Sequence, residues 1–154
     1  MNDVNTRHAL SHERDFHAWS QDQGRRLREI RPDNIDWVNV AEEIEGLGRS
    51  QRSEIRSRLI AALAHLLKWA HQPDGRNNSW RASIVGARNE MLHELSDSAS
   101  LRRYPGEVLT RQYPVARLDA SGDTGLALET FPEVCPFTIE QILDPDFWPD
   151  APQG

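Results

Sequence analysis

The chain has 154 residues, of which 38% are hydrophobic and 27% are charged. This length suits one ordinary domain, and the composition is typical of a globular protein rather than of a membrane protein or a disordered chain. No stretch of 18 apolar residues occurs, and the polar first ten residues lack the apolar run of a signal peptide. We therefore expect a cytoplasmic protein.

The formal net charge of −6 is unevenly distributed along the chain. Arg117 is the last basic residue and eight acidic residues follow it, so residues 118–154 carry a charge of −8. Residues 1–117 hold all 18 basic side chains and the other 16 acidic ones. The sequence predicts an acidic C-terminal segment that folds back onto a weakly basic, arginine-rich body.

Four segments have apolar residues at helical spacing, and we expect a helix over each of residues 11–31, 36–71, 79–96 and 100–118. Residues 1–10 are expected to be flexible. Ser11 or Asp15 is placed to cap the first helix. Its apolar stripe, which we expect to face the core, consists of Phe16, Trp19, Gln23, Leu27 and Ile30.

The second predicted helix is long for a compact domain, because about 35 residues at about 1.5 Å each would span about 50 Å. We therefore expect a break or bend. Gly46 and Gly48 are the expected place, since each glycine weakens a helix by about 1 kcal/mol relative to alanine. A continuous helix that tolerates both glycines is the alternative. The inward stripe of this helix begins with Val40, Ile44 and Leu47.

Residues 126–150 are rich in proline and in large apolar side chains. The prolines prevent long elements, and the apolar groups are too many for a free tail, so we expect an extended segment wrapped on the helices. Thr138 and Gln141 form a capping box, which predicts a short helix over Ile139 to Leu143. The expected fold class is all-α: an up-and-down four-helix bundle with a bent second helix and this wrapped segment, in a single domain over residues 1–154.

Several strings of the sequence form a recognisable set. They are Asp15-Phe16 with Trp19, the segment Val40–Ser50, His65–Trp69, Gln72-Pro73 followed by Ser79–Arg81, Cys135–Thr138 and Ile142–Phe147. Together they resemble domain of unknown function family 29, an uncharacterised bacterial family. The resemblance runs from about Asp15 to about Phe147. It implies an all-helical fold with an up-and-down bundle arrangement, and it brings no assigned activity.

One set of residues would suit a metal-assisted hydrolase or a small-ligand-binding bundle. Glu42 or Glu43 would approach His65 if the helix folded back at its glycines. Glu90 and His93 have the spacing that di-metal bundles use, but no other helix supplies the second copy of that motif. A polar pair that bridges two helices explains Glu42, Glu43 and His65 equally, and we expect neither a cofactor nor a metal.

Nucleic-acid binding is a second alternative. Arg49, Arg52 and Arg56, together with Arg58, form a basic stretch that would grip phosphates. A solvated helix face, or a docking surface for the acidic segment, also explains these arginines.

Aromatic and sulfur-containing side chains give weaker signals. Trp69 and Trp80 lie near helix ends, where they would anchor the core or line a ligand cleft. Cys135 is the only cysteine, so it can form no intramolecular disulfide.

The sequence contains no phosphate-binding loop, nucleophile elbow, Ser/His/Asp order or HExxH motif, which argues against an enzyme. The leading interpretation is a non-catalytic cytoplasmic binding or interaction module with an unknown protein partner. The candidate binding residues are Glu42, Glu43, Arg49, Arg52, Arg56, His65, Trp69 and Trp80. We expect no membrane contact, and a homodimer is favoured over a monomer. Neither a substrate nor the identity of the partner follows from the sequence.

Overall fold

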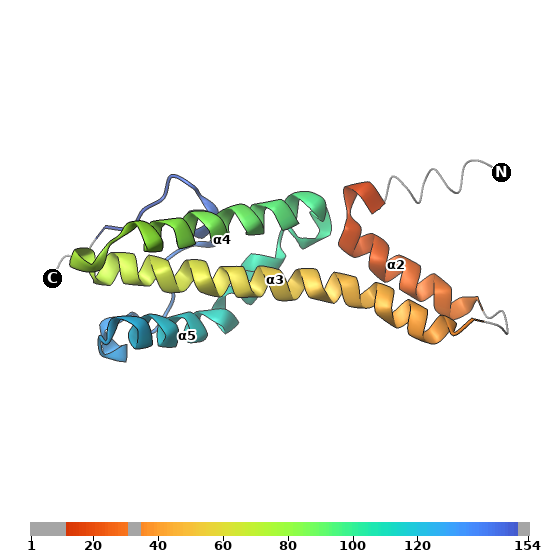
Figure 1. Cartoon of the computed structure of the whole chain (residues 1–154), viewed down its shortest axis with the longest axis horizontal. Coiled ribbons are helices and arrows are strands. Elements are labelled where there is room, and N and C mark those ends of the chain that lie inside the picture. Colours follow the sequence, from red (N-terminus) through yellow and green to blue (C-terminus); the bar gives the residue numbers. More distant parts are fainter. Residues whose placement is uncertain (1–11, 31–34, 151–154) are drawn as a thin grey trace. The chain divides into compact units, whose positions relative to one another are not determined.

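A computed structural model describes residues 12–30 and 35–150 (Figure 1). Its helices are α2 (Phe16–Glu29), α3 (Trp37–His71), α4 (Asn78–Asp97), α5 (Tyr104–Thr124) and the short α6 (Ile139–Leu143), with 3-10 turns at Pro73–Gly75, Ala99–Leu101 and Leu128–Thr130. In the described ranges the only β-type pairing is an isolated bridge between Asp15 and Ser98. The predicted all-α class is confirmed, and the up-and-down topology stays a prediction. Residues 1–10 and the possible cap Ser11 lie outside the described residues.

The described residues form two compact units. Unit 1 contains those up to Glu54 together with His93–Arg103, and unit 2 contains Ile55–Leu92 together with those from Tyr104 onward. Both α3 and α4 therefore contribute residues to each unit. Organisation as a single domain stays a prediction. None of the helices in the described ranges combines the length and the apolar character that a membrane crossing needs.

Asp15 begins α2 and also fastens a distant part of unit 1 to it. Its carboxylate accepts a hydrogen bond from the backbone N–H of Ala18 at 2.9 Å, which is the predicted N-cap contact. The same carboxylate accepts a hydrogen bond from the Ser100 hydroxyl at 2.8 Å. One acidic side chain thus caps the start of a helix and ties it to a segment 85 residues further along the chain.

α3 runs without interruption from Trp37 to His71, so the predicted break at Gly46 and Gly48 is wrong. The physical reason is that Gly48 allows close packing and makes no turn. A Cβ at Gly48 would lie 2.6 Å from Ser20 Oγ and 2.8 Å from His17 Nδ1, so α2 approaches α3 this closely only because the side chain is absent. A bend in α3, as distinct from a break, stays a prediction.

The sides of α2 and α3 that meet are small and polar. The buried residues of α2 are His17, Ser20 and Gly24, and they face a side of α3 on which Ala41 and Gly48 are buried. The predicted inward stripes are therefore only partly buried in this part of the chain, because close backbone approach overrode the apolar pattern. Ile30, just after α2, is 52% exposed, and Val40 and Leu47 of α3 are 37% and 49% exposed, whereas Phe16, Trp19, Leu27 and Ile44 are half-buried.

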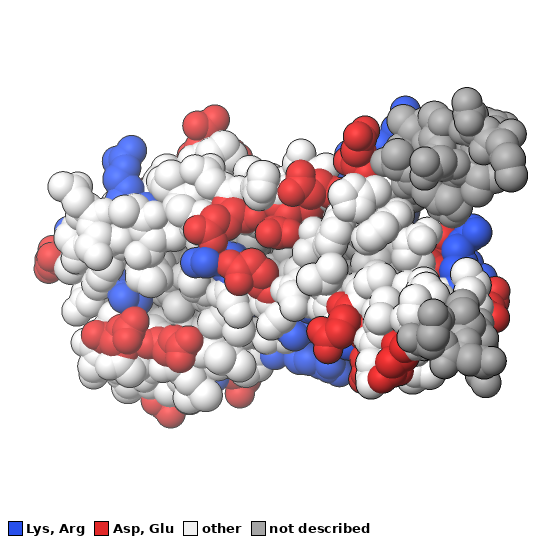
Figure 2. Space-filling model, turned by 45° about the vertical axis from the view of Figure 1, so that its right-hand side comes forward, with Lys and Arg blue, Asp and Glu red and all other residues white. Residues whose placement is uncertain are grey.

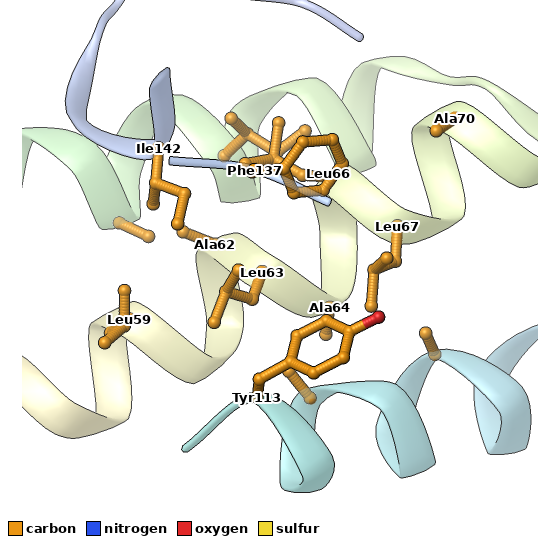
Figure 3. Close-up of a cluster of buried hydrophobic side chains, with 14 of the residues drawn as sticks. Leu59, Ala62, Leu63, Ala64, Leu66, Leu67, Ala70, Tyr113, Phe137 and Ile142 are labelled. Carbon is orange, nitrogen blue, oxygen red and sulfur yellow. The ribbon is translucent and has the colours of Figure 1, made fainter. Parts of the chain in front are cut away.

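The core of unit 2 joins α3, α4 and α5 to the C-terminal segment (Figure 3). Leu59, Leu63 and Leu66 of α3 are fully buried there. The C-terminal segment adds three buried side chains, Phe131, Phe137 and Ile142. Burying each contributes about 1.5–3 kcal/mol, so the segment is part of the core and the predicted wrapping is confirmed.

The capping box of α6 is also confirmed. The Gln141 N–H donates to Thr138 Oγ1 at 3.2 Å, and the Thr138 N–H donates to Gln141 Oε1 at 3.0 Å. These two bonds satisfy donors that the first turn of a helix would otherwise leave unpaired. The local pattern alone was enough to place this helix, because every group involved lies within four residues.

Arg88 of α4 holds the C-terminal segment against the helices. Its side chain is only 1% exposed, and Nε donates to the Ile142 carbonyl while Nη2 donates to the Phe147 carbonyl, both at 2.8 Å. Burial lowers the pKa of Arg88, and the nearby Asp144 carboxylate opposes this. The Trp148 ring lies against the guanidinium, 5.5 Å from its centre. Burying a guanidinium is costly unless its donors are bonded, and Nε and Nη2 are bonded here, while Nη1 has no partner among the described residues.

Other basic residues of the body hold the residues after Arg117 in two ways: Lys68 pairs with the Asp123 carboxylate at 3.0 Å, whereas the arginines donate to backbone carbonyl oxygens. Arg117 donates to the Phe131 carbonyl at 3.0 Å, and Arg76 donates to the Pro149 carbonyl at 3.4 Å. These bonds, like those of Arg88, end on backbone carbonyl oxygens and not on carboxylates. The acidic side chains of the segment are thereby left for its outer surface, where most of them are exposed.

Substituting Gly48 by alanine should destabilise the protein by about 1–3 kcal/mol, because the added methyl group overpacks the contact with Ser20 and His17. The matched control is Gly46→Ala, where the nearest atom to the new Cβ is the flexible Arg49 Nη2 at 3.4 Å. That change should be neutral or stabilise the helix by up to about 1 kcal/mol. Urea unfolding followed by circular dichroism measures both, and equal effects would contradict the packing role of Gly48.

Substituting Arg88 by alanine should cost about 2–4 kcal/mol, because it removes three bonds to backbone carbonyls and leaves a cavity beside Trp148. The control is Arg81→Ala. Arg81 is exposed and lies 5.2 Å from the Trp148 ring centre, so its loss should cost less than about 1 kcal/mol. Thermal unfolding distinguishes the two, and a similar loss in both variants would argue against Arg88 as the anchor.

Candidate interaction surface

The residues proposed for metal-assisted chemistry are not gathered by a fold-back. Glu42 and Glu43 are exposed on the part of α3 that belongs to unit 1. His65 lies 22 residues after Glu43 on the same uninterrupted helix, in unit 2, with Nδ1 2.9 Å from the Ala61 carbonyl. Within the described ranges, no three His, Cys, Asp or Glu side chains group so as to hold a metal ion.

Glu90 and His93 each have a charged neighbour. Glu90 forms an ion pair with Arg58 in unit 2. His93 Nε2 lies 3.4 Å from Asp97 Oδ2, one helical turn away in α4. These contacts are those of an exposed helix face.

The arginines proposed for phosphate binding have mixed surroundings. Arg49 and Arg52 are exposed, whereas Arg56 donates to the Tyr104 hydroxyl at 2.6 Å. Arg58 lies on a different side of α3 from Arg56, because two residues turn a helix by about 200°. On the face in Figure 2, Lys and Arg side chains are scattered among acidic ones. The contacts of Arg56 with Tyr104 and of Arg58 with Glu90 support solvated and packing roles over a continuous phosphate-binding patch.

Trp69 and Trp80 belong to a cluster of rings and cations in unit 2. The Trp69 ring lies 4.8 Å from the Trp148 ring, and Lys68 Nζ lies 4.7 Å from the centre of the Trp80 ring. Lys68 is itself buried and pairs with Asp123 at 3.0 Å. The rings thus join α3, α4 and the C-terminal segment, which supports the core-anchoring interpretation of both tryptophans.

The sequence analysis missed a surface in unit 1 that we call the hairpin face. It consists of the apolar side chains on one side of α2 and α3: Phe16, Trp19, Leu27, Ile30, Val40, Ile44 and Leu47. On both helices, the apolar residues come one position before the residues of the side that packs against the other helix. One position corresponds to about 100°, or about a quarter turn, around the helix. The two helices are antiparallel, because Ser20 meets Gly48 while Gly24 meets Glu45. In an antiparallel pair these equal rotations place both stripes on the same side.

The end of α4 borders the hairpin face. Gln51 Nε2 donates to Glu94 Oε2 at 3.0 Å, and the Ser98 hydroxyl donates to Gln51 Oε1 at 3.1 Å. A cavity of about 460 Å³ opens at this point, lined by His12, Glu13, Phe16, Gln51, Glu94 and Asp97. The hairpin face therefore has an acidic end next to α4. Further from this acidic end, the side chains of Val40 and Leu47 are exposed.

Aromatic rings form the part of the hairpin face nearest this acidic end. The Phe16 and Trp19 rings are stacked with their centres 5.8 Å apart, and the His12 ring meets Trp19 edge-on at 4.5 Å. Small residues on the neighbouring side of α2, Ser20 and Gly24, were the sequence signal for this arrangement. They marked the side of α2 that would approach another helix closely.

His17 sits under this surface and makes the contact between α2 and α3 depend on pH. Its Nδ1 donates to the Gly48 carbonyl at 3.1 Å. Burial lowers the pKa of His17 below its ordinary value of 6.5; the bond to Gly48 opposes this, the Arg52 charge adds to it, and the Asp15 charge opposes it. The folded state therefore binds this proton more weakly than the unfolded chain does.

The free energy of unfolding should consequently hold its full value above pH 6.5 and fall as the pH drops below it, because protonation then favours the unfolded chain. His71, whose pKa is also lowered by burial, adds to the same trend. The variant His17→Asn keeps a side-chain N–H donor and does not titrate, so its dependence should be shallower. Urea unfolding at pH 7.5 and pH 5 tests this, and an unchanged slope in His17→Asn would refute it.

Comparison with known proteins agrees with the fold. The model of the family described as domain of unknown function DUF29 matches residues 11–148. A crystal structure of an alpha-helical protein of unknown function from Rhodospirillum rubrum is similar over 88% of this chain and 90% of that one, with 25% identity and a TM-score of 0.70. No curated protein matches. The chain belongs to the DUF29 family, whose function is unknown.

Proposed function

We propose that this chain is a non-catalytic interaction module that binds an amphipathic helix of a partner protein on the hairpin face. One observation carries the proposal: α2 packs on α3 through His17, Ser20 and Gly24, so its apolar stripe lies off this contact, with Phe16, Trp19 and Leu27 half-buried and Ile30 exposed. An apolar stripe that the packing of the described residues leaves partly accessible is typical of a protein-binding surface. This binding takes place in the cytoplasm.

A helix fits this surface better than an extended peptide does. Two antiparallel helices with apolar residues on the same side form a shallow groove between them, and a third helix packs into such a groove with its own apolar stripe. The described chain offers no sheet edge to which an extended strand could add. α4 already lies beside one end of the groove. The partner helix would occupy the part of the groove beyond the end of α4.

Charge adds a requirement on the partner. The acidic end of the hairpin face carries Glu13, Glu94 and Asp97 around the Phe16 ring. Glu43 lies further along α3, on the outer border of the apolar stripe. A partner helix with Arg or Lys at the end next to Glu94 would complement these carboxylates. This complementarity would raise both the association rate and the specificity of binding.

The other surfaces considered for a partner fit less well. A partner that displaced the C-terminal segment would have to replace Phe131, Phe137 and Ile142 in the core of unit 2. A partner on the arginine stretch would have to compete with the contacts of Arg56 and Arg58. The hairpin face needs neither rearrangement, so binding there costs least.

The proposal is tested with a photo-crosslinking residue placed at Val40 in the full chain, expressed at native level in its host. The cross-linked peptide should map to one partner segment with apolar residues at helical spacing and a basic end. A synthetic peptide of that segment should bind the purified chain, and Leu47→Asp should weaken binding about tenfold or more. Raising the salt concentration should also weaken it.

The matched control carries the photo-crosslinking residue at Leu118, an exposed apolar position on α5 in unit 2. Equal adducts from Val40 and Leu118, or none from Val40, would rule the proposal out. An adduct between two copies of this chain would show that a second copy covers the hairpin face. That result would replace the partner helix by the homodimer favoured in the sequence analysis.

A further inference from the structure

A second cavity, independent of the hairpin face, lies in unit 2. It has a volume of about 370 Å³ and is lined by Leu109, Thr110, Tyr113 and Pro114 of α5 and by Glu133, Val134, Cys135 and Phe137 of the C-terminal segment. Its size is within the usual range of about 300–1,000 Å³ for small-molecule sites. The confirmed wrapping of the C-terminal segment creates this cavity, since each of the two elements supplies one wall.

The inner walls of this α5 cavity are apolar and have few free polar groups. Tyr113 and Phe137 are buried, and the Tyr113 hydroxyl donates to the Pro132 carbonyl at 2.6 Å. The Cys135 thiol donates to the Phe137 carbonyl at 3.3 Å. Val134, in contrast, is 80% exposed at the mouth. A bound molecule would cover this side chain and meet mainly ring and methyl surfaces.

Most of the remaining polar groups of the α5 cavity are acceptors, and the Thr110 hydroxyl can both donate and accept. Pro114 has no N–H, so it cannot donate to the Thr110 carbonyl four residues earlier, as other residues in a helix do. Both residues line the cavity, and the Glu133 carboxylate lies at its exposed rim. The lining contains no Lys or Arg. A ligand that brings a donor and a positive charge is therefore complementary, and an anionic ligand is not.

We infer that the α5 cavity binds a small, mainly apolar molecule that carries an ammonium group or another N–H donor. The apolar body lies between Tyr113, Pro114 and Phe137. The donor points to the mouth, where the Thr110 carbonyl and the Glu133 carboxylate accept from it. This site goes beyond the interaction proposed for unit 1 and does not depend on it.

The only cysteine of the chain gives a direct test, because it lines the cavity. The full-length protein is treated with methyl methanethiosulfonate, and modification of Cys135 is followed by mass spectrometry. The probes are 2-phenylethylamine, neutral 2-phenylethanol and anionic 3-phenylpropionate. 2-Phenylethylamine should slow the modification most and 3-phenylpropionate least. Glu133→Gln should weaken the protection by 2-phenylethylamine about two- to fivefold, as expected for an exposed ion pair.

The variant Thr110→Trp fills the mouth and should abolish the protection, and Val115→Trp, at an exposed position of α5 outside the lining, should keep it. Circular dichroism checks that both variants are folded. No protection by any probe would overturn the inference. Equal protection by the amine and the carboxylate would overturn the ligand class, and full protection in a folded Thr110→Trp would overturn the location.

Discussion

The close contact between α2 and α3 at Gly48 decides what unit 1 presents to its surroundings. Because Gly48 has no side chain, Ser20 and His17 reach the backbone of α3, and the His17 imidazole closes the contact with a bond to the Gly48 carbonyl. This side of α2 is small and polar, so burying it leaves the apolar stripe of the same helix off the contact, where Phe16, Trp19 and Leu27 are only half-buried. A larger residue at position 48 would push the helices apart, and α2 could then rotate its apolar side inward, as ordinary amphipathic packing favours. The surface proposed for partner binding is thus a direct result of one helix contact.

Unit 2 depends on a different kind of constraint, a buried charge without a carboxylate partner in contact. Nε and Nη2 of the Arg88 guanidinium donate to carbonyl oxygens at the end of α6 and at Phe147, where backbone groups would otherwise lack partners, while Nη1 has no partner among the described residues. Leaving such groups unpaired in the interior would cost more than the bonds return, so Arg88 fixes the path of the segment as well as its attachment. The α5 cavity lies along that path, since four of the residues 133–137 line it together with Pro114.

The features that the sequence predicted correctly are those decided within one or two helical turns. The capping box at Thr138 and the N-cap at Asp15 need only neighbouring residues, and the stripe from Ile55 to Leu66 follows from periodicity where the packing is apolar. The predictions failed where the local structure depends on a contact with a residue far away in the sequence. Gly48 was interpreted as a break because the approach of Ser20, 28 residues earlier, is invisible in the local pattern. The sequence analysis did not single out Arg88, although its position four residues after Ile84 and three before Met91 places it on the apolar side of α4.

The order in which the two units use the chain bears on how the protein is made. Unit 1 takes its residues from both sides of the stretch Ile55–Leu92, and unit 2 is completed only by the residues after Tyr104. Contacts such as that of Asp15 with Ser100 join residues 85 positions apart, and loops of this length slow the search for the native state. During synthesis on the ribosome, α2 and the first half of α3 cannot complete their contacts until the end of α4 has been made. The helices of unit 2 cannot complete theirs until nearly the last residues have been made. Neither unit is a continuous piece of the gene, so a premature stop codon before Arg103 would leave both without their closing contacts.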